Sequence, residues 1–267
     1  MKTRNTLSLL AIGTIAAFIA APAAIAADLT DVGFIDQAAI GSLPQFQRAN
    51  GEVAQYKAQL DAQYAAATKG KSQNDQARIA QQYQQKFFTK QRDVLGPLFG
   101  RARAAIAQVS SSDKLSVVVD KRIVVFGGQD ITKNVIDLVN GPGQVVPPSA
   151  TPPPSEIGFV DQNQIDQVPK IKQANDDFMK YAADQRQNAM KQMQSAKNNP
   201  QQQQQIFQTY QKALSSQQDK TLKPLVDQTR TAMAKVAKQK DLILVVDRTD
   251  VIYGGTDITS DVQNALK

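Results

Sequence analysis

The side chains that could act as general acids or bases here are carboxylates, lysines and tyrosines. The chain has 267 residues and contains no His, no Cys and no Trp. Without His and Cys there is no Ser-His-Asp or Cys-His nucleophile system, no thiol redox chemistry and no His/Cys zinc site. The remaining candidates for general acid–base catalysis are therefore Asp, Glu, Lys and Tyr side chains.

Two carboxylates have the sequence setting of a catalytic residue. Asp120 and Asp247 each end an apolar Val-Val run, but neither has an evident catalytic partner, so structural capping is the better interpretation. The segments "GGQD" and "GGTD" suggest phosphate loops, yet no Lys-Ser/Thr follows with the spacing of a P-loop. We therefore predict no enzyme, and no catalytic, cofactor-binding or metal site.

These motifs occur twice because the chain repeats itself. "VGFIDQAAIGSLPQFQRAN" from Val32 matches "IGFVDQNQIDQVPKIKQAN" from Ile157, and "KLSVVVDKRIVVFGGQDITKNV" from Lys114 matches "DLILVVDRTDVIYGGTDITSDV" from Asp241. Two matches in the same order predict two copies of one structural unit. The offset grows from 125 to 127 between the two blocks, which places a length change where a loop tip is expected.

Within each repeat the pattern predicts strand, helix, turn, helix, strand, strand and helix. The opening strands are expected at 32–36 and 157–161, and Pro44 and Pro169 suit the first turn of a helix. Apolar residues then recur three and four apart on both sides of a polar tip, which predicts two antiparallel helices with a narrow seam. The expected seam comprises Phe46, Ala49, Val53, Tyr56, Leu60, Tyr64, Ile79, Tyr83 and Phe87, then Ile171, Ala174, Phe178, Tyr181, Met190, Met193, Ile206, Tyr210 and Leu214.

Three further features complete the expected unit. Pro97 and Pro224 each interrupt the return helix and predict a kink there. The segments "VVF" at 124–126 and "VIY" at 251–253 predict a second strand that ends at a Gly-Gly turn. The closing helices begin at "DIT", where Asp or Thr suits the N-cap.

The fold class is thus α+β and mostly α, with two units that are each a small β body carrying a long α-helical hairpin arm. We expect the first unit at 27–140 with its arm at about 44–110, and the second at 157–267 with its arm at about 169–240. Residues 141–156 read as a Pro-rich linker. Residues 1–26 read as a cleaved signal peptide, with Lys2 and Arg4 before an apolar run and an A-x-A-like end, and this implies export.

Several of these features together resemble a known protein family. A short opening strand, a long polar helical hairpin, a Val-Val-Asp strand and a closing D-I-T helix resemble the Skp/OmpH family, most specifically in "DLILVVDRTDVIYGGTDITSDVQNALK". The resemblance covers the mature chain twice, apart from the linker. It implies a periplasmic chaperone for outer-membrane proteins, a homotrimer whose bodies share a β-barrel and whose arms enclose an unfolded client. The better-known members have one unit per chain, so the duplication leaves the oligomer number open.

The sequence gives a separate reason to expect association. Each repeat supplies about three short strands, too few for a stable sheet with protected edges. Pairing with other copies would cover those edges, whether within a chain, between chains or both. We therefore expect a homo-oligomer, and the resemblance favours a trimer.

Charge is segregated in the same way in both repeats. Residues 44–110 hold ten Lys/Arg against four Asp/Glu, a net of +6, and residues 169–240 hold thirteen against five, a net of +8. The mature chain totals +5, so everything outside the arms totals −9. A charged helix face is usually just solvated. The same segregation in both repeats favours a functional interpretation, because basic arms would attract acidic unfolded chains and anionic membrane surfaces.

We predict an ATP-independent periplasmic holding chaperone for unfolded outer-membrane β-barrel proteins, with anionic lipid or lipopolysaccharide as a further partner. The alternative is a structural envelope protein that uses the arms as spacers or membrane contacts. Nucleic acid is not expected as a partner, because the chain is exported and shows no recognition module. The candidate client-binding residues are arm cations and two aromatics beside the seam: Lys69, Lys71, Arg78, Lys86, Phe88, Lys191, Lys197, Phe207 and Lys212.

Overall fold

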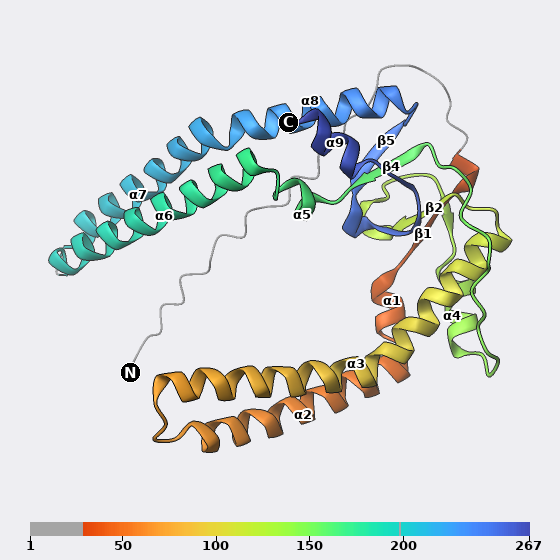
Figure 1. Cartoon of the computed structure of the whole chain (residues 1–267), viewed down its shortest axis with the longest axis horizontal. Helices are drawn as coiled ribbons and strands as arrows, with labels where there is room; N and C mark the ends of the chain where they lie inside the picture. The colour runs from red at the N-terminus through yellow and green to blue at the C-terminus, as the bar shows by residue number, and fades with distance from the viewer. Residues whose placement is uncertain (1–28, 198) are drawn as a thin grey trace. The chain divides into compact units, whose positions relative to one another are not determined.

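A computed structural model describes residues 29–197 and 199–267, so the expected signal peptide at 1–26 lies outside the described residues. The predicted α+β, mostly α fold class with two helical hairpin arms is confirmed (Figure 1). The chain forms two compact units. One, here the N-terminal unit, contains residues 29–155 together with Asp250–Gly255, and the other, the C-terminal unit, contains Glu156–Thr249 together with Thr256–Lys267.

The N-terminal unit has the predicted opening strand, helical hairpin, Val-rich strand and closing helix, together with a short helix after the opening strand and one strand from the second repeat. Its elements are η1 (Leu29–Asp31), β1 (Val32–Ile35), α1 (Gln37–Gly41), α2 (Pro44–Thr68), α3 (Gln73–Ser112), β2 (Val117–Asp120), η2 (Lys121–Ile123), β3 (Gln129–Asp130), α4 (Thr132–Asn140) and β6 (Val251–Gly254).

The C-terminal unit has the same plan, and its return helix is divided in two. Its elements are β4 (Ile157–Val160), α5 (Gln162–Ile165), α6 (Pro169–Ser195), α7 (Pro200–Thr221), α8 (Lys223–Gln239), β5 (Leu244–Asp247), β7 (Thr256–Asp257) and α9 (Thr259–Ala265), with η3 (Arg248–Asp250) between β5 and β6.

The two sheets differ by one strand. In the N-terminal unit the order is β3-β1-β2-β6, with β1 parallel to β2 and β3. Strand β6 adds antiparallel to β2 and places Tyr253 opposite Val118, with a bulge between Val118 and Val119. In the C-terminal unit the order is β5-β4-β7, and all pairs are parallel. The continuous Val-rich runs suit strands that are covered on both faces.

Equivalent positions of the two repeats build the two cores. In the N-terminal unit the short helix α1, the start of the arm, β2 and α4 close over one cluster, and the C-terminal unit uses the corresponding elements. The corresponding buried pairs are Ile35 and Val160, Ile40 and Ile165, Leu43 and Val168, Phe46 and Ile171, Leu115 and Leu242, Ile131 and Ile258, and Val135 and Val262. The repeat in sequence therefore corresponds to the same core packing in both units.

Several predicted details differ from the structure. The segment 124–126 is not a strand, whereas its equivalent β6 is one. Pro97 lies inside one continuous helix α3, but Pro224 stands at the start of α8 directly after α7 ends, so an interruption is found in the second arm alone. The closing helices have Ile131 and Ile258 at the N-cap, and the N-caps predicted there are therefore wrong.

The expected linker has neither helix nor strand, and its beginning is held against the arm. The Arg101 guanidinium of α3 donates to the carbonyl oxygens of Leu138 at 2.9 Å, Val139 at 2.8 Å and Gly143 at 2.8 Å. These acceptors lie at the C-terminal end of α4 and just beyond it, where carbonyls lack helical partners. Arg101 therefore fixes the direction in which the chain leaves the N-terminal core.

Candidate functional site

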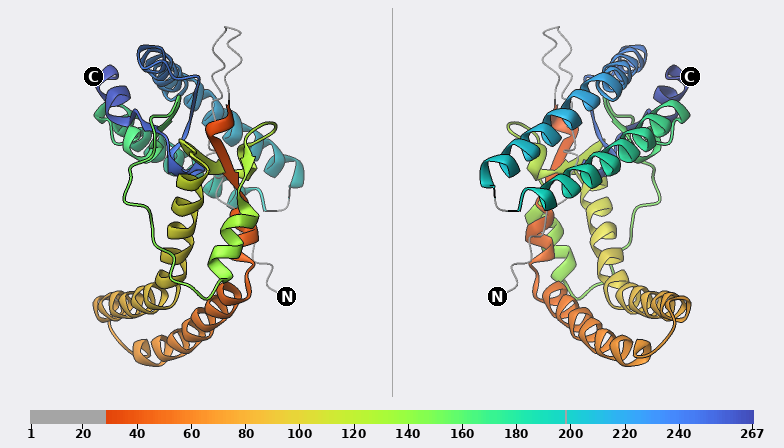
Figure 2. Two further views of the ribbon diagram at one scale, coloured as in Figure 1. Left: turned by 90° about the vertical axis from the view of Figure 1, so that its right-hand side faces the viewer. Right: turned by 90° about the vertical axis from the view of Figure 1, so that its left-hand side faces the viewer.

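The arm of the N-terminal unit is a hairpin of α2 and α3, which lie side by side along the arm (Figure 2). Phe46, Ala49, Val53 and Leu60 of α2 are buried, as the seam predicts. Nearer the tip the rings of Tyr64 and Tyr83 meet edge to face, with their centroids 5.8 Å apart. Packing is thus continuous from the body to near the tip and becomes thinner outward.

The arm of the C-terminal unit, α6 with α7, has much less buried apolar surface. Ile171 is the one buried residue inside α6, and none is buried inside α7 among the described residues. The predicted seam residues are half-buried instead, namely Ala174, Phe178, Tyr181, Met193, Ile206, Tyr210 and Leu214. Few buried contacts mean that separating these two helices costs little free energy.

Acidic side chains of the first arm are all engaged with neighbouring cations. Asp61 pairs with Lys57 at 2.6 Å, and Asp75 with Arg78 at 3.0 Å. Glu52 and Asp93 pair with Lys90 and Arg92. The hydrogen bond from Lys90 to Glu52 raises the pKa of that lysine above its ordinary value. The excess positive charge of the arm therefore lies on its remaining cations.

All seven candidate cations are exposed on the arms. Lys69 and Lys71 flank Gly70 at the tip between α2 and α3, and Lys197 lies in the turn that follows α6. Arg78 is engaged by Asp75, so it is a weaker candidate than the sequence suggests. Lys86 lies with its Nζ 5.0 Å from the centroid of the Tyr83 ring, where a cation–π attraction holds it at the surface.

The two candidate aromatics are also exposed, Phe88 to 55% and Phe207 to 40%. Exposure of this size means that neither side chain belongs to the seam. Phe88 still touches its neighbour Phe87, with ring centroids 6.1 Å apart. Their contact with a client stays a prediction.

Sequence reasoning missed other exposed apolar side chains. Met190, which was expected in the seam, is 45% exposed, so that prediction is wrong. Met179 and Phe99 are 57% and 52% exposed, although Phe99 also packs edge to face on Phe46 at 5.5 Å between ring centroids. Helical spacing gave no signal for Phe99 or Met179, because each directly follows a residue that does pack.

The first arm carries shallow grooves of mixed polarity. One, of about 500 Å³, is lined by Tyr56, Lys86 and Lys90 together with polar residues of α3. A second, of about 240 Å³, is lined by Leu60, Tyr64, Tyr83 and Phe87 with polar neighbours. Apolar seam edges beside lysines suit weak contacts repeated along an extended chain.

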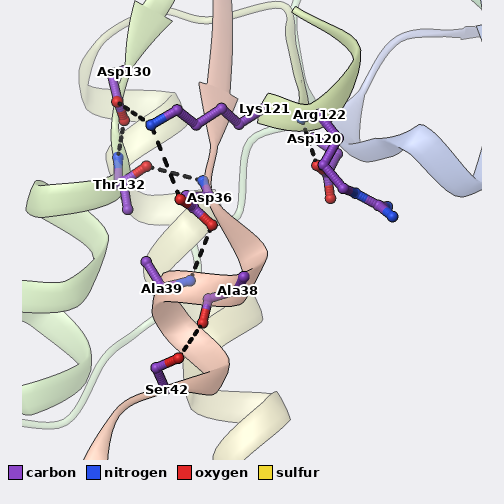
Figure 3. A network of polar contacts seen from close by, with 9 residues as sticks. All are labelled: Asp36, Ala38, Ala39, Ser42, Asp120, Lys121, Arg122, Asp130 and Thr132. Atoms are coloured by element: carbon purple, nitrogen blue, oxygen red, sulfur yellow. Dashed lines mark hydrogen bonds and ion pairs between the residues drawn. The ribbon is translucent and has the colours of Figure 1, made fainter.

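Asp120 has a structural role, as the capping interpretation requires. It is buried, and its carboxylate accepts hydrogen bonds from the backbone N–H of Arg122 at 2.8 Å and from Arg122 Nε at 2.9 Å (Figure 3 shows the two residues). A third hydrogen bond comes from Gln37 Nε2 at 2.6 Å. Burial opposes ionisation, but these hydrogen bonds outweigh it and lower the pKa of Asp120 below its ordinary value. Asp247 likewise accepts from the backbone N–H of Thr249 at 2.8 Å.

The described part of the chain contains neither a metal-binding cluster nor a membrane-spanning helix. No group of three or more acidic residues gathers there in a way that could hold a metal ion. Among the same residues, none of the helices combines the length and apolarity that crossing a membrane requires.

Comparison with known protein families finds one match, and it covers both repeats. A family described as "Outer membrane protein (OmpH-like)" matches residues 44–139 and again residues 160–266. Each match runs from the arm or just before it to the closing helix of its repeat. No curated protein matches the chain, and no solved structure matches it.

Proposed function

Because this chain belongs to the OmpH-like family and carries the family's unit twice, we propose that it is an ATP-independent chaperone that holds unfolded outer-membrane proteins. Membership alone gives the chain a chaperone-type role and an association with outer-membrane proteins. The proposal adds the state of the client, which is unfolded, and the manner of binding, which is holding without chemistry.

The observation that carries the proposal is the construction of the arms. Each is a helical hairpin with net positive charge and with aromatic or methionine side chains exposed beside a thinly packed seam. Positive charge attracts acidic segments from a distance, and exposed apolar groups add short-range contacts of low individual strength. Many such contacts along one client give useful affinity without a defined pocket.

The wider arrangement is proposed on the same basis. Residues 27–140 and 157–267 are the two family units joined by the linker 141–156, and residues 1–26 direct export to the periplasm, where the family acts. The resemblance favours a homotrimer of chains. The same basic arms would bind anionic lipid or lipopolysaccharide when no client is present.

The proposal is tested by diluting an outer-membrane β-barrel protein from urea with and without the mature chain. We expect light scattering to fall to a low level at equimolar amounts of the native assembly, without nucleotide. A denatured soluble protein of similar size and near-neutral charge serves as the comparison client. Undiminished aggregation of the outer-membrane protein at equimolar assembly would count against holding.

A second measurement separates holding from an envelope-spacing role. Sedimentation with anionic vesicles, with and without unfolded client, reports whether the arms prefer lipid or polypeptide. A chaperone is expected to leave the vesicles when client is added, because both compete for the same basic surface. Vesicle binding that client does not change would favour the structural role.

A further inference from the structure

The methionines of the chain are distributed unequally between the two repeats. After Met1 all of them fall in the second arm, namely Met179, Met190, Met193 and Met233. The first repeat contains none, and the position there that corresponds to Met179 is Ala54. The large apolar side chains exposed on the first arm are the rings of Phe88 and Phe99. Thioether sulfur is therefore a feature of the second arm alone.

Two of these four methionines lie at the surface of α6. Met179 is 57% exposed and Met190 is 45% exposed. They are eleven residues apart, which is roughly three turns of an α-helix, so they lie on the same face. Met193 is half-buried in the seam, and Met233 packs, partly buried, against the C-terminal core. The sulfur atoms therefore form an exposed pair and a sheltered pair.

A cation lies on the same face of α6 between the two exposed methionines. Arg186 is exposed, and it follows Met179 by seven residues and precedes Met190 by four, so all three side chains lie along one side of the helix. Charge at such a surface attracts acidic segments, and thioether side chains then adapt to apolar groups of different shape. This face of α6 therefore combines long-range attraction with adaptable short-range contact.

We propose that Met179 and Met190 are a reversible oxidation site that sets how tightly the second arm holds its client, a role that rests on the chaperone function proposed above. Hydrogen peroxide supplies the oxygen. The sulfur lone pair attacks one peroxide oxygen, the O–O bond breaks, an S=O bond forms, and the proton of the transferred oxygen leaves with the hydroxide as water. Sulfur is oxidised by two electrons and the peroxide is reduced. Methionine sulfoxide reductases reverse the step.

Oxidation changes the apolar contact of the second arm and leaves its charge as it was. A sulfoxide is polar where the thioether was apolar, so contact with apolar groups of a client becomes weaker. Because the net charge of the arm is unchanged, attraction over distance and the rate of capture stay the same. The loss therefore falls on the dissociation rate. The first arm has no sulfur to oxidise and keeps its contacts.

The order in which the four methionines react tests the site without any client. The mature chain is treated with graded amounts of hydrogen peroxide, and mass spectrometry of its peptides locates each added oxygen. We expect Met179 and Met190 to react before Met193 and Met233, and the reductases for both sulfoxide epimers to restore them in the folded protein. The same chain in urea is the control, where all four should react alike. Equal reaction in the folded chain, or sulfoxides that the reductases leave in place, would overturn the proposal.

The kinetics of client binding test the consequence. The peroxide is removed before a labelled, unfolded outer-membrane protein is added, so that the methionines of the client stay reduced. We expect the oxidised chain to release the client about 3–10-fold faster than the reduced chain, with an unchanged association rate. Treatment with the reductases should restore slow release.

Two double variants assign the effect to the exposed pair. M179L/M190L keeps apolar side chains of similar volume, so it should hold client as the reduced parent does and be insensitive to peroxide. The matched control M193L/M233L replaces the sheltered pair and should respond to peroxide as the parent does. Far-UV circular dichroism checks that both variants are folded.

The outcomes separate this proposal from the chaperone function. Peroxide sensitivity that persists in M179L/M190L, or that disappears in M193L/M233L, would show that the exposed pair is not responsible. Client release that oxidation of the parent does not change would refute the oxidation site while client holding stands. A reduced parent that binds no client would refute both.

Discussion

The backbone N–H of Asp36 donates to Thr132 Oγ1 at 3.0 Å, and joins the end of β1 to the start of α4 across 96 residues. The C-terminal unit repeats the bond, from the N–H of Asp161 to Thr259 Oγ1 at 3.0 Å. Asp130 and Asp257 accept from the N–H of these same threonines, each at 2.9 Å (Figure 3 shows the first copy). The D-I-T motif is therefore a clasp between the opening strand and the closing helix.

Removing the clasp is expected to destabilise the N-terminal unit. In T132V the shape is kept, but the Asp36 N–H loses its acceptor in a partly buried place, which costs about 1–3 kcal/mol of unfolding free energy. Urea unfolding measures it. T231V is the control, because Thr231 is exposed and bonds only the carbonyl of Asp227 in its own helix. Equal midpoints for the two variants would contradict the role of the clasp.

Gly254 is the residue that allows β6 to approach β2. A Cβ added there would stand 2.0 Å from the carbonyl oxygen of Ser116, and its φ of 66° is one that side chains disfavour. We expect G254A to lose about 1–3 kcal/mol of unfolding free energy or to release β6 altogether. G100A, at a helical glycine with nothing within 4 Å, should be neutral or slightly stabilising. Hydrogen exchange of β2 reports the release, and exchange as slow as in the parent would exclude it.

The repeat could be predicted from sequence, but the unequal use of its strands could not. Pro44, Pro169 and the Val-Val-Asp runs carry local signals, and they fall in the predicted elements. "VVF" and "VIY" have nearly the same local preference, so only the presence or absence of a partner edge makes one a strand and leaves the other exposed. Strand pairing is a tertiary event that periodicity does not encode.

The effect of the two prolines also depends on tertiary packing. Leu95, just before Pro97, is buried with Ala49 and Val53, whereas the equivalent Leu222 is only half-buried. Packing against α2 supports α3 through the missing hydrogen bond, and the second arm lacks that support. In the candidate site, the exposure of the lysines could be predicted from their residue type. Phe99 and Met179 could not be identified from sequence, because neither falls on the predicted helical seam.

Asp120 should make the stability of the N-terminal unit depend on pH. Its pKa is lowered in the folded state, so ionised Asp120 contributes stability above the unfolded pKa of about 4, and this is lost as pH falls through the folded pKa. We expect D120N to unfold at lower urea than the parent at pH 7, with the difference shrinking below about pH 4. D137N, on the exposed face of α4, is the control. A difference that stays constant down to pH 2 would show that the charge is not responsible.

The two arms should differ in stability. L60A removes a side chain that is 5% exposed in the first arm, and we expect a loss of about 2–4 kcal/mol. L214A, at a half-buried position of the second arm, should cost less than about 1 kcal/mol. Amide exchange should accordingly be faster in α6 and α7 than in α2. Equal exchange in the two arms would mean that other copies support the second one in the assembly.

Charge at the arm tip should govern how fast a client is captured. K69Q/K71Q removes two exposed cations from the tip, whereas K133Q/K267Q removes two exposed cations from the bodies, so net charge falls equally in both variants. Attraction over distance depends on where charge lies, so we expect the tip variant to capture unfolded outer-membrane protein about 2–10-fold more slowly and the body variant to match the parent. The gap should close as salt rises from low values to about 0.5 M, because screening shortens the reach of surface charge. Stopped-flow fluorescence of a labelled client measures the rate. Equal slowing in the two variants would show that net charge, rather than basic arms, draws the client in.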